Sequence, residues 1–96
     1  MAAYIVVQVD IKDPGRYESY KTMVPPTLEK FGGRFLVRGG RTETLEGGWA
    51  PQRFVLLEFP SAERAKAWWE SDGYAPAKAL RQATSVTQMI LAEGLP

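Results

Sequence analysis

The chain contains no cysteine and no histidine among its 96 residues. Without cysteine it cannot form a disulfide, a thiolate nucleophile, a zinc–thiolate site or an iron–sulfur cluster. Without histidine it lacks the commonest general base and metal ligand near neutral pH, so His-based Ser or Cys triads cannot be assembled. Asparagine is missing as well. The acidic residues are scattered along the chain, so we expect no metal, haem or other cofactor to be required.

Charge and hydropathy argue against two further classes of partner. Twelve Lys and Arg against eleven Asp and Glu give a net charge of +1, and no basic run is long enough for a nucleic-acid binder. No stretch approaches the roughly 20 apolar residues of a membrane span, and the apolar run near the N-terminus is too short for a signal peptide. We therefore expect no nucleic-acid partner, no membrane partner and a cytoplasmic location.

What is present is the composition of a globular protein. Hydrophobic residues make up 45% of the chain and charged residues 24%. At this length such a composition predicts one domain over residues 1–96.

Apolar and β-branched runs predict four strands. These cover Tyr4–Ile11, Arg34–Arg38, Gln52–Phe59 and Ser85–Ala92. We further expect a β-bulge at Gly39-Gly40, followed by an extended stretch over 41–46.

Capping residues predict the helices. Asp13 and Pro14 begin the first, Pro25-Pro26 predict a kink or a division into two segments, and Gly32-Gly33 end it. Ser61 caps the next helix, whose apolar positions include Trp68 and Trp69, and residues 71–73 end it. A short turn over 74–81 follows.

The order of elements, β-α-β-β-α-β, predicts a ferredoxin-like α+β fold with a four-stranded antiparallel sheet and both helices on one face. The first and third strands carry apolar residues at both odd and even positions, so both faces of the sheet must be covered. Helices can cover only one of them. We expect a second copy of the chain to cover the other, which gives a homodimer through the open sheet face.

Several blocks of sequence carry a family resemblance. They are FGGRFLVRGG (31–40), TLEGGW (44–49), RFVLLEFPS (53–61), AKAWWESDGY (65–74) and Arg81. Together they resemble the domain of unknown function (DUF) 1330 family over nearly the whole chain. The resemblance implies a dimeric α/β barrel and no particular reaction. Related barrels include cofactor-independent monooxygenases, muconolactone isomerases and haem-degrading enzymes, and the lack of Asn and His argues against the haem degraders.

Arg38 and Glu58 are the first candidate site residues. If the hairpin is centred near residue 48, the two side chains lie opposite one another on the sheet face of Leu36, Phe54 and Leu56. They would form either a structural ion pair or an anion-binding Arg beside a carboxylate that acts as a base.

A second group of candidates lies around the end of the second helix. Trp69, Ser71 and Tyr74 combine an aromatic wall with polar groups, and Arg81 precedes the last strand. Trp69 could equally be core, Ser71 a local cap, and Arg81 the partner of an acid. Tyr17 and Tyr20 are core-edge residues by their spacing, although one phenol could reach a cavity between helix and sheet.

These residues support two classes of function. In the first, a pocket between sheet and helices binds a small anionic or carbonyl-bearing metabolite through Arg38, Trp69, Ser71 and Arg81, and Glu58 or Tyr74 handles protons. Such a protein would be a ligand binder, or a cofactor-free isomerase or oxygenase. In the second, the chain is a non-catalytic dimeric ligand-binding or protein-interaction module. The sequence leaves open whether it is an enzyme.

Overall fold

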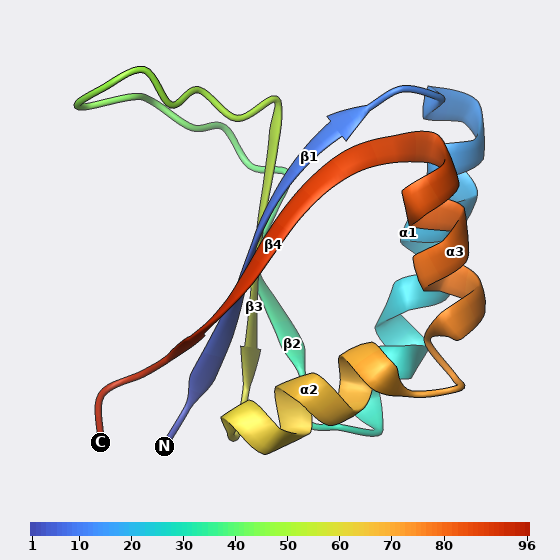
Figure 1. Ribbon diagram of the computed structural model, residues 1–96, viewed down its shortest axis with the longest axis vertical. Coiled ribbons are helices and arrows are strands. Elements are labelled where there is room, and N and C mark those ends of the chain that lie inside the picture. The colour runs from blue at the N-terminus through green and yellow to red at the C-terminus, as the bar shows by residue number, and fades with distance from the viewer.

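The computed structural model describes residues 1–96 as one antiparallel sheet with three helices packed against one face (Figure 1). The strand order is β2-β3-β1-β4. In chain order the elements are β1 (Ala3–Ile11), α1 (Pro14–Glu29), β2 (Arg34–Arg38), β3 (Arg53–Phe59), α2 (Ala62–Glu70), α3 (Ala75–Thr84) and β4 (Ser85–Glu93). The ferredoxin-like α+β prediction is confirmed. Within a single chain the sheet stays open, with β2 and β4 at its edges, so the chain alone forms no barrel.

Alternation along the central strands sorts their side chains between the two faces of the sheet. In β1 the odd residues from Ala3 to Val9 are buried against the helices, and in β3 Leu57 and Phe59 are buried with them. The neighbouring even residues, such as Val6 and Leu56, pair with each other in register on the other face. The core therefore lies between the sheet and the helices, and the second face of the sheet has no cover within the chain.

Helix α1 begins and ends where the sequence predicted. The Asp13 side chain accepts a hydrogen bond from the Arg16 amide at 3.3 Å, and Pro14 occupies the first turn at no cost in hydrogen bonds. Gly32, at φ 72°, turns the chain after the helix. Residues 14–29 nevertheless form one helix that contains both Pro25 and Pro26, so the division into two segments was wrong.

Strand β2 differs from its prediction in register. The bulge lies between Phe35 and Val37, with Leu36 as the extra residue, and not at Gly39-Gly40. At φ 71°, Gly39 ends the strand, and residues 39–52 form a long loop with no strand at 41–46. This extra residue decides which face of the sheet Arg38 occupies.

Helices α2 and α3 meet at an angle on the helix side of the sheet (Figure 1). Ser61 caps α2 as predicted, with its Oγ accepting from the Arg64 amide at 3.2 Å. The predicted turn at 74–81 is in fact a ten-residue helix, α3, which has Pro at its first turn. Of the two tryptophans on α2, Trp68 is core and Trp69 is 39% exposed.

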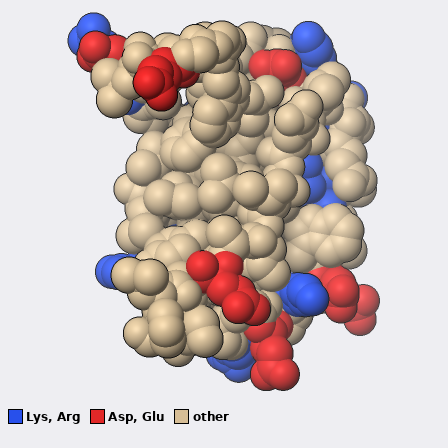
Figure 2. All heavy atoms as spheres, turned by 60° about the vertical axis from the view of Figure 1, so that its left-hand side comes forward, with Lys and Arg blue, Asp and Glu red and all other residues tan.

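The open face of the sheet carries a broad uncharged surface (Figure 2). Leu36, Val86 and Ile90 are exposed, with Ile90 at 65%. No helix in the chain is long and apolar enough to cross a membrane.

Candidate functional site

A small cavity lies between α1, α3 and the helix side of the sheet. Its volume is about 30 Å³, room for roughly two or three water molecules. Most of its wall is apolar. Its charged lining residues are Lys21, Arg38, Arg53 and Arg81, and no Asp or Glu lines it. Because the three arginines come from β2, β3 and α3, only the folded chain brings them together.

Arg38 reaches the cavity from the end of β2. Its Nη2 donates to the backbone carbonyl of Lys21 at 2.5 Å, and its guanidinium lies 4.3 Å from the centre of the Phe35 ring. Pro25 lies four residues after Lys21 and has no N–H, so this carbonyl lacks its usual donor within the helix. The proline inside α1 thus frees the acceptor that positions Arg38.

Arg53, at the start of β3, is opposite Val9 on the helix side of the sheet. Its guanidinium packs over the Tyr17 ring at 5.7 Å and against the bare backbone of Gly39, where an added Cβ would collide with Nη1. The Nε of Arg53 is buried and has no hydrogen-bond partner. Such an orphaned donor is rare in proteins and costs about 1–3 kcal/mol.

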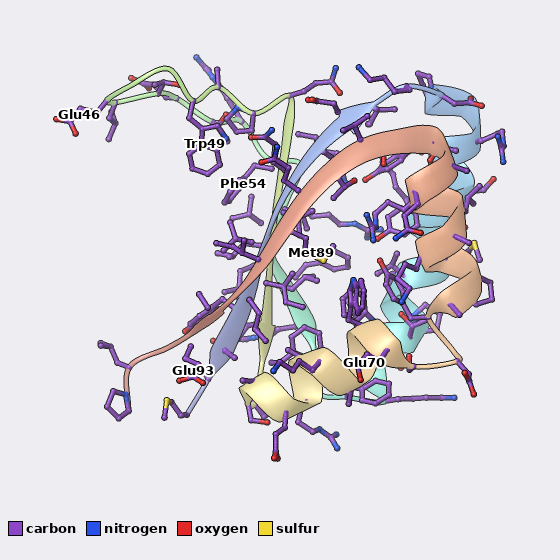
Figure 3. The ribbon with its side chains drawn as sticks, in the orientation of Figure 1. Glu46, Trp49, Phe54, Glu70, Met89 and Glu93 are labelled. Atoms are coloured by element: carbon purple, nitrogen blue, oxygen red, sulfur yellow. The ribbon has the colours of Figure 1, made fainter.

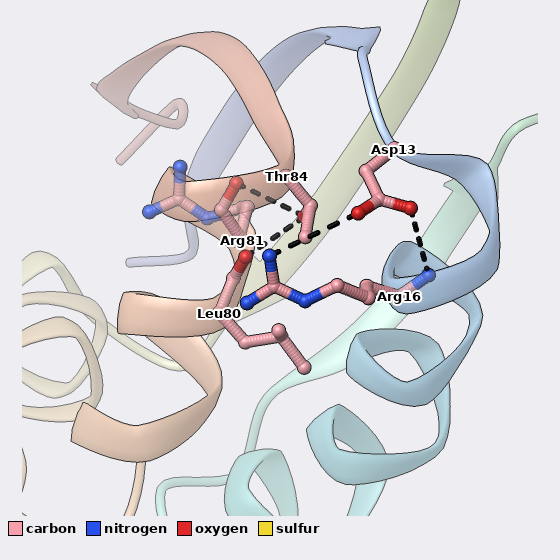
Figure 4. A network of polar contacts seen from close by, with 5 residues as sticks. All are labelled: Asp13, Arg16, Leu80, Arg81 and Thr84. Carbon is pink, nitrogen blue, oxygen red and sulfur yellow. Dashed lines mark hydrogen bonds and ion pairs between the residues drawn. The ribbon is translucent and has the colours of Figure 1, made fainter.

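Arg81 enters the cavity from α3 and is only 5% exposed. Its Nε donates to the Tyr74 hydroxyl at 3.3 Å, and no carboxylate lies within ion-pair distance of its guanidinium. The last turn of α3 lies beside the start of α1 (Figure 4). The Lys12 and Asp13 amides donate to the Thr84 carbonyl at this junction, and within α3 the Thr84 hydroxyl donates to the Leu80 carbonyl. These bonds hold Arg81 in place.

Three phenols connect the arginines. The Tyr20 and Tyr74 hydroxyls are 2.9 Å apart, and the Tyr17 and Tyr20 rings are 5.3 Å apart. Burial, and then the adjacent Tyr74, raises the pKa of Tyr20 well above its ordinary value. Burial also raises the pKa of Tyr17, although the neighbouring Arg53 opposes the rise. At neutral pH Tyr17 and Tyr20 are therefore neutral, and they are hydrogen-bond donors rather than bases.

Glu58 lies away from this cavity. It pairs with Arg34, whose Nη2 is 2.6 Å from Oε1, on the open face of the sheet. The predicted pairing of Glu58 with Arg38 was wrong for two reasons: the register of the hairpin places Arg34 opposite Glu58, and the bulge at Leu36 turns Arg38 to the helix side, opposite Val55. The structure therefore does not bring Arg38 and Glu58 together.

The remaining predicted residues separate into two groups. Tyr74 is fully buried and does not line the cavity, but its hydroxyl is hydrogen-bonded to Tyr20 and Arg81, which do. The Ser71 hydroxyl donates to the Trp68 carbonyl and accepts from the Tyr74 amide, so it acts as a local cap between α2 and α3. Trp69 lines a separate outer groove, with the Lys78 ammonium 3.8 Å from its ring centre.

Arg53 is the site residue that sequence reasoning missed. It begins the third strand with the same parity as the core residues Val55 and Leu57, which is a signal for a charge on the buried face. No group of three or more acidic side chains lies close enough together to hold a metal ion.

Comparison with known proteins supports the fold. A protein of unknown function from Rhodopseudomonas palustris superposes with a TM-score of 0.80 at 18% identity, covering 99% of this chain and 83% of the other. A dimeric ferredoxin-like protein of unknown function from Jannaschia gives 0.73 at 12%, covering 98% and 100%. SnoaB from Streptomyces nogalater, a cofactor-independent oxygenase, gives 0.68 at 12%, covering 99% and 94%. No curated protein matches the sequence.

At these identities the structural neighbours show a shared fold and nothing more about the site. The family is shown by the sequence itself: residues 2–95 match the family described as "Domain of unknown function (DUF1330)". The match spans every strand and helix of the structure, and it includes all three cavity arginines. The chain therefore belongs to the DUF1330 family.

Proposed function

We propose that the cavity binds the anion of a small organic acid or of an acidic carbonyl compound. The observation that carries the proposal is the set of Arg38, Arg53 and Arg81, which line one cavity with no carboxylate among the lining residues. Arginine is suited to this task because its planar fork of donors matches a carboxylate or an enolate.

The energetics favour an anion as the partner. A buried cation with no counter-charge is destabilising, and Arg81 is nearly inaccessible while Arg53 has an unused buried donor. A bound anion would supply both the missing charge and the missing acceptor. Since the cavity holds only a few water molecules, we expect the group that enters it to be about the size of a carboxylate.

The same geometry limits the chemistry. No carboxylate lines the cavity, and Tyr17 and Tyr20 have raised pKa values, so these groups supply no base for removing a proton from carbon. Reactions that suit this site start from a ligand already ionised in solution. Arginines then stabilise its negative charge, and the phenols can donate a hydrogen bond or a proton.

A second candidate function is cofactor-free oxygenation of such an anion. It is favoured by the likeness in fold to SnoaB, described as a cofactor-independent oxygenase. The substrate anion would supply the electrons for attack on dioxygen, which forms a carbon–oxygen bond and a peroxide anion, and a phenol would return a proton to the peroxide. Oxygen uptake with 1,3-cyclohexanedione, an enolate at neutral pH, separates this oxygenase from a non-catalytic binder.

Thermal melts with sodium pyruvate test the anion-binding proposal against sodium chloride at equal ionic strength. Pyruvate at ten times its Kd should add about 1.4 kcal/mol, a rise in Tm of several degrees for a domain of this size. Arg53→Met keeps an aliphatic chain and removes the charge, so it should abolish this rise. Arg34→Met, the same change on the open face, should retain it.

Two results would contradict the proposal. One is a wild-type protein whose Tm does not respond to pyruvate or other small carboxylates. The other is an equal response in Arg53→Met and Arg34→Met. Arg38→Met should behave as Arg53→Met does and should cost little stability, because Glu58 keeps its Arg34 partner.

The biological unit we propose is a homodimer formed through the open sheet face. Its support is the uncharged surface of Figure 2, with Val86 58% and Ile90 65% exposed, together with the dimeric ferredoxin-like protein among the structural neighbours. A self-complementary contact between two such faces would bury the surface in a closed assembly. Light scattering that gives a 10.7 kDa species at micromolar concentration would overturn this proposal.

A further inference from the structure

A second hollow lies outside the arginine cavity, between α2, α3 and the edge strand β4. Its volume is about 360 Å³, against about 30 Å³ for the cavity. Its apolar lining comes from α2, β4 and Ile5 of β1, and the polar lining residues are Lys66, Arg81, Gln82 and Thr87. As in the cavity, no Asp or Glu lines this groove.

The groove lies between α2, α3 and β4, and the two helices run at an angle to each other (Figure 1). Strand β4 is an edge strand, and its helix-side residues Met89 and Leu91 are only partly buried, whereas Ile5 and Val7 beside them in β1 are core. Figure 3 shows Met89 pointing from β4 toward the helices. Trp69 lines the groove from α2 and is 39% exposed.

Two residues belong to both hollows. Arg81 and Met89 line the cavity on one side and the groove on the other, so together they form the partition between them. Arg81 carries the charge of this partition and Met89 its flexible apolar part. Thioether side chains adapt readily to a new neighbour because they are unbranched and rotate freely.

We propose that the groove binds the aromatic body of an aryl carboxylate, or of an aryl enol or phenol in its ionised form, whose anionic end meets Arg81 at the partition. This inference rests on the proposed anion-binding function and names the class of its ligand. The cavity admits only a group of carboxylate size, so any larger ligand must extend beyond it. The adjoining space is apolar on the walls that Trp69 and Leu91 form, and Lys66 and Arg81 supply its only charges.

The test uses 2-naphthoate, with pyruvate as the small acid and 2-naphthamide as the neutral analogue. The three tryptophans give three indole N–H signals in a nitrogen-15 correlation spectrum, and Trp69 lies in the groove whereas Trp49 lies outside it. Naphthoate should shift the Trp69 signal and leave that of Trp49 in place. Its Kd should be at least tenfold lower than those of pyruvate and of the amide.

Matched variants assign the effect to the groove. Trp69→Ala, at a half-exposed position, should weaken naphthoate binding at least tenfold and leave pyruvate binding unchanged. The control is Trp49→Ala, the same change in the loop 39–52, which should alter neither. Met89→Ala is a second test. Because it makes the partition smaller, the Kd of naphthoate should stay the same or fall.

The outcomes separate this inference from the proposed function. If pyruvate binds and naphthoate binds no more tightly, the groove inference is overturned and the anion-binding proposal stands. Naphthoate binding that Trp69→Ala does not weaken overturns it as well. If neither acid binds, the proposed function fails and the groove inference fails with it.

Discussion

Arg34 and Arg38 stand four residues apart on one short strand and have opposite surroundings. Arg34 forms an ion pair with Glu58 on the open face, whereas Arg38 enters a cavity on the helix side that contains no acid. In a regular strand, residues four apart share a face. The extra residue Leu36 breaks that rule: the register pairs Arg34 with Glu58, and the bulge turns Arg38 to the helix side, where no acid lines the cavity.

The two faces of the sheet also differ in the charges they carry and in what covers them. The helix side contains Arg53 and Arg81 among apolar residues and phenols, and their positive charge has no partner in the chain. The open face is largely uncharged and exposed. We infer that each face is completed by a different kind of partner, a small anion on the helix side and a second copy of the chain on the open side.

Adjacent leucines on β3 provide the largest expected contrast between the faces. Leu57 is core and Leu56 faces the open side. Leu57→Lys buries a charge without a partner and should cost about 4 kcal/mol or more, enough to leave much of the protein unfolded. Leu56→Lys should fold, with a Tm above room temperature, but sediment as a monomer.

Circular dichroism and sedimentation measure these two outcomes on the same samples. A Leu56→Lys variant that still dimerises with unchanged affinity would show that the open face is not the interface. A well-folded Leu57→Lys variant would contradict the assignment of the core to the helix side.

Alkaline pH provides the next contrast. Because the pKa of Tyr20 is higher in the folded protein than in the unfolded chain, the folded state retains a proton that the unfolded chain releases above about pH 10. This contribution to stability is complete below pH 10. It should decrease by about 1.4 kcal/mol per pH unit as the pH rises further.

Urea unfolding at several pH values between 9 and 11 checks this dependence. Tyr20→Phe removes one such phenol, so its stability should fall less steeply than that of the wild type. Tyr4→Phe, the same change on the open face, should follow the wild type. Equal slopes for Tyr20→Phe and the wild type would contradict a raised pKa at Tyr20.

Two glycines provide the smallest and most selective contrast. Gly39 and Gly47 both have positive φ angles, 71° and 79°, so alanine at either position should cost about 1–2 kcal/mol in backbone strain. Only at Gly39 would the new Cβ meet the Arg53 guanidinium; at Gly47 there is open space. Gly39→Ala should therefore also lose the pyruvate-induced rise in Tm.

The two glycine variants are compared in melts with and without pyruvate. Gly47→Ala should be destabilised and still respond to pyruvate. A full pyruvate response in Gly39→Ala would show that the position of Arg53 does not matter for binding.

Much of the fold could be predicted from local pattern. Asp13 and Ser61 cap their helices as expected, and every boundary of the four strands agrees to within one residue. These features depend on nearby residues, so the sequence specifies them directly. The helix over 75–84 was predicted too short, because Pro76 begins a helix here and the weak apolar pattern gave no sign of its length.

The candidate site could be predicted only in part. Arg38 and Arg81 were chosen from local cues and line the cavity, and Tyr74 is hydrogen-bonded to Arg81, whereas Arg53 was overlooked and Glu58 lies on the other face. The misplacement of Glu58 has two physical causes: the hairpin register pairs Glu58 with Arg34, and the bulge at Leu36 turns Arg38 to the helix side. A bulge changes parity along a strand, and no residue near Leu36 marks it, since the glycine pair that suggested a bulge stands after the strand.

The sequence by itself determined the order of the elements, the two apolar parities of the central strands and the absence of thiol and imidazole chemistry, because each is a property of composition or local spacing. Only the tertiary structure decided which charges meet. Arg38, Arg53 and Arg81 are distant in the chain, and their meeting depends on a bulge, on the carbonyl that Pro25 leaves free and on the bare backbone of Gly39. Contacts of that kind arise between elements, so no local pattern encodes them.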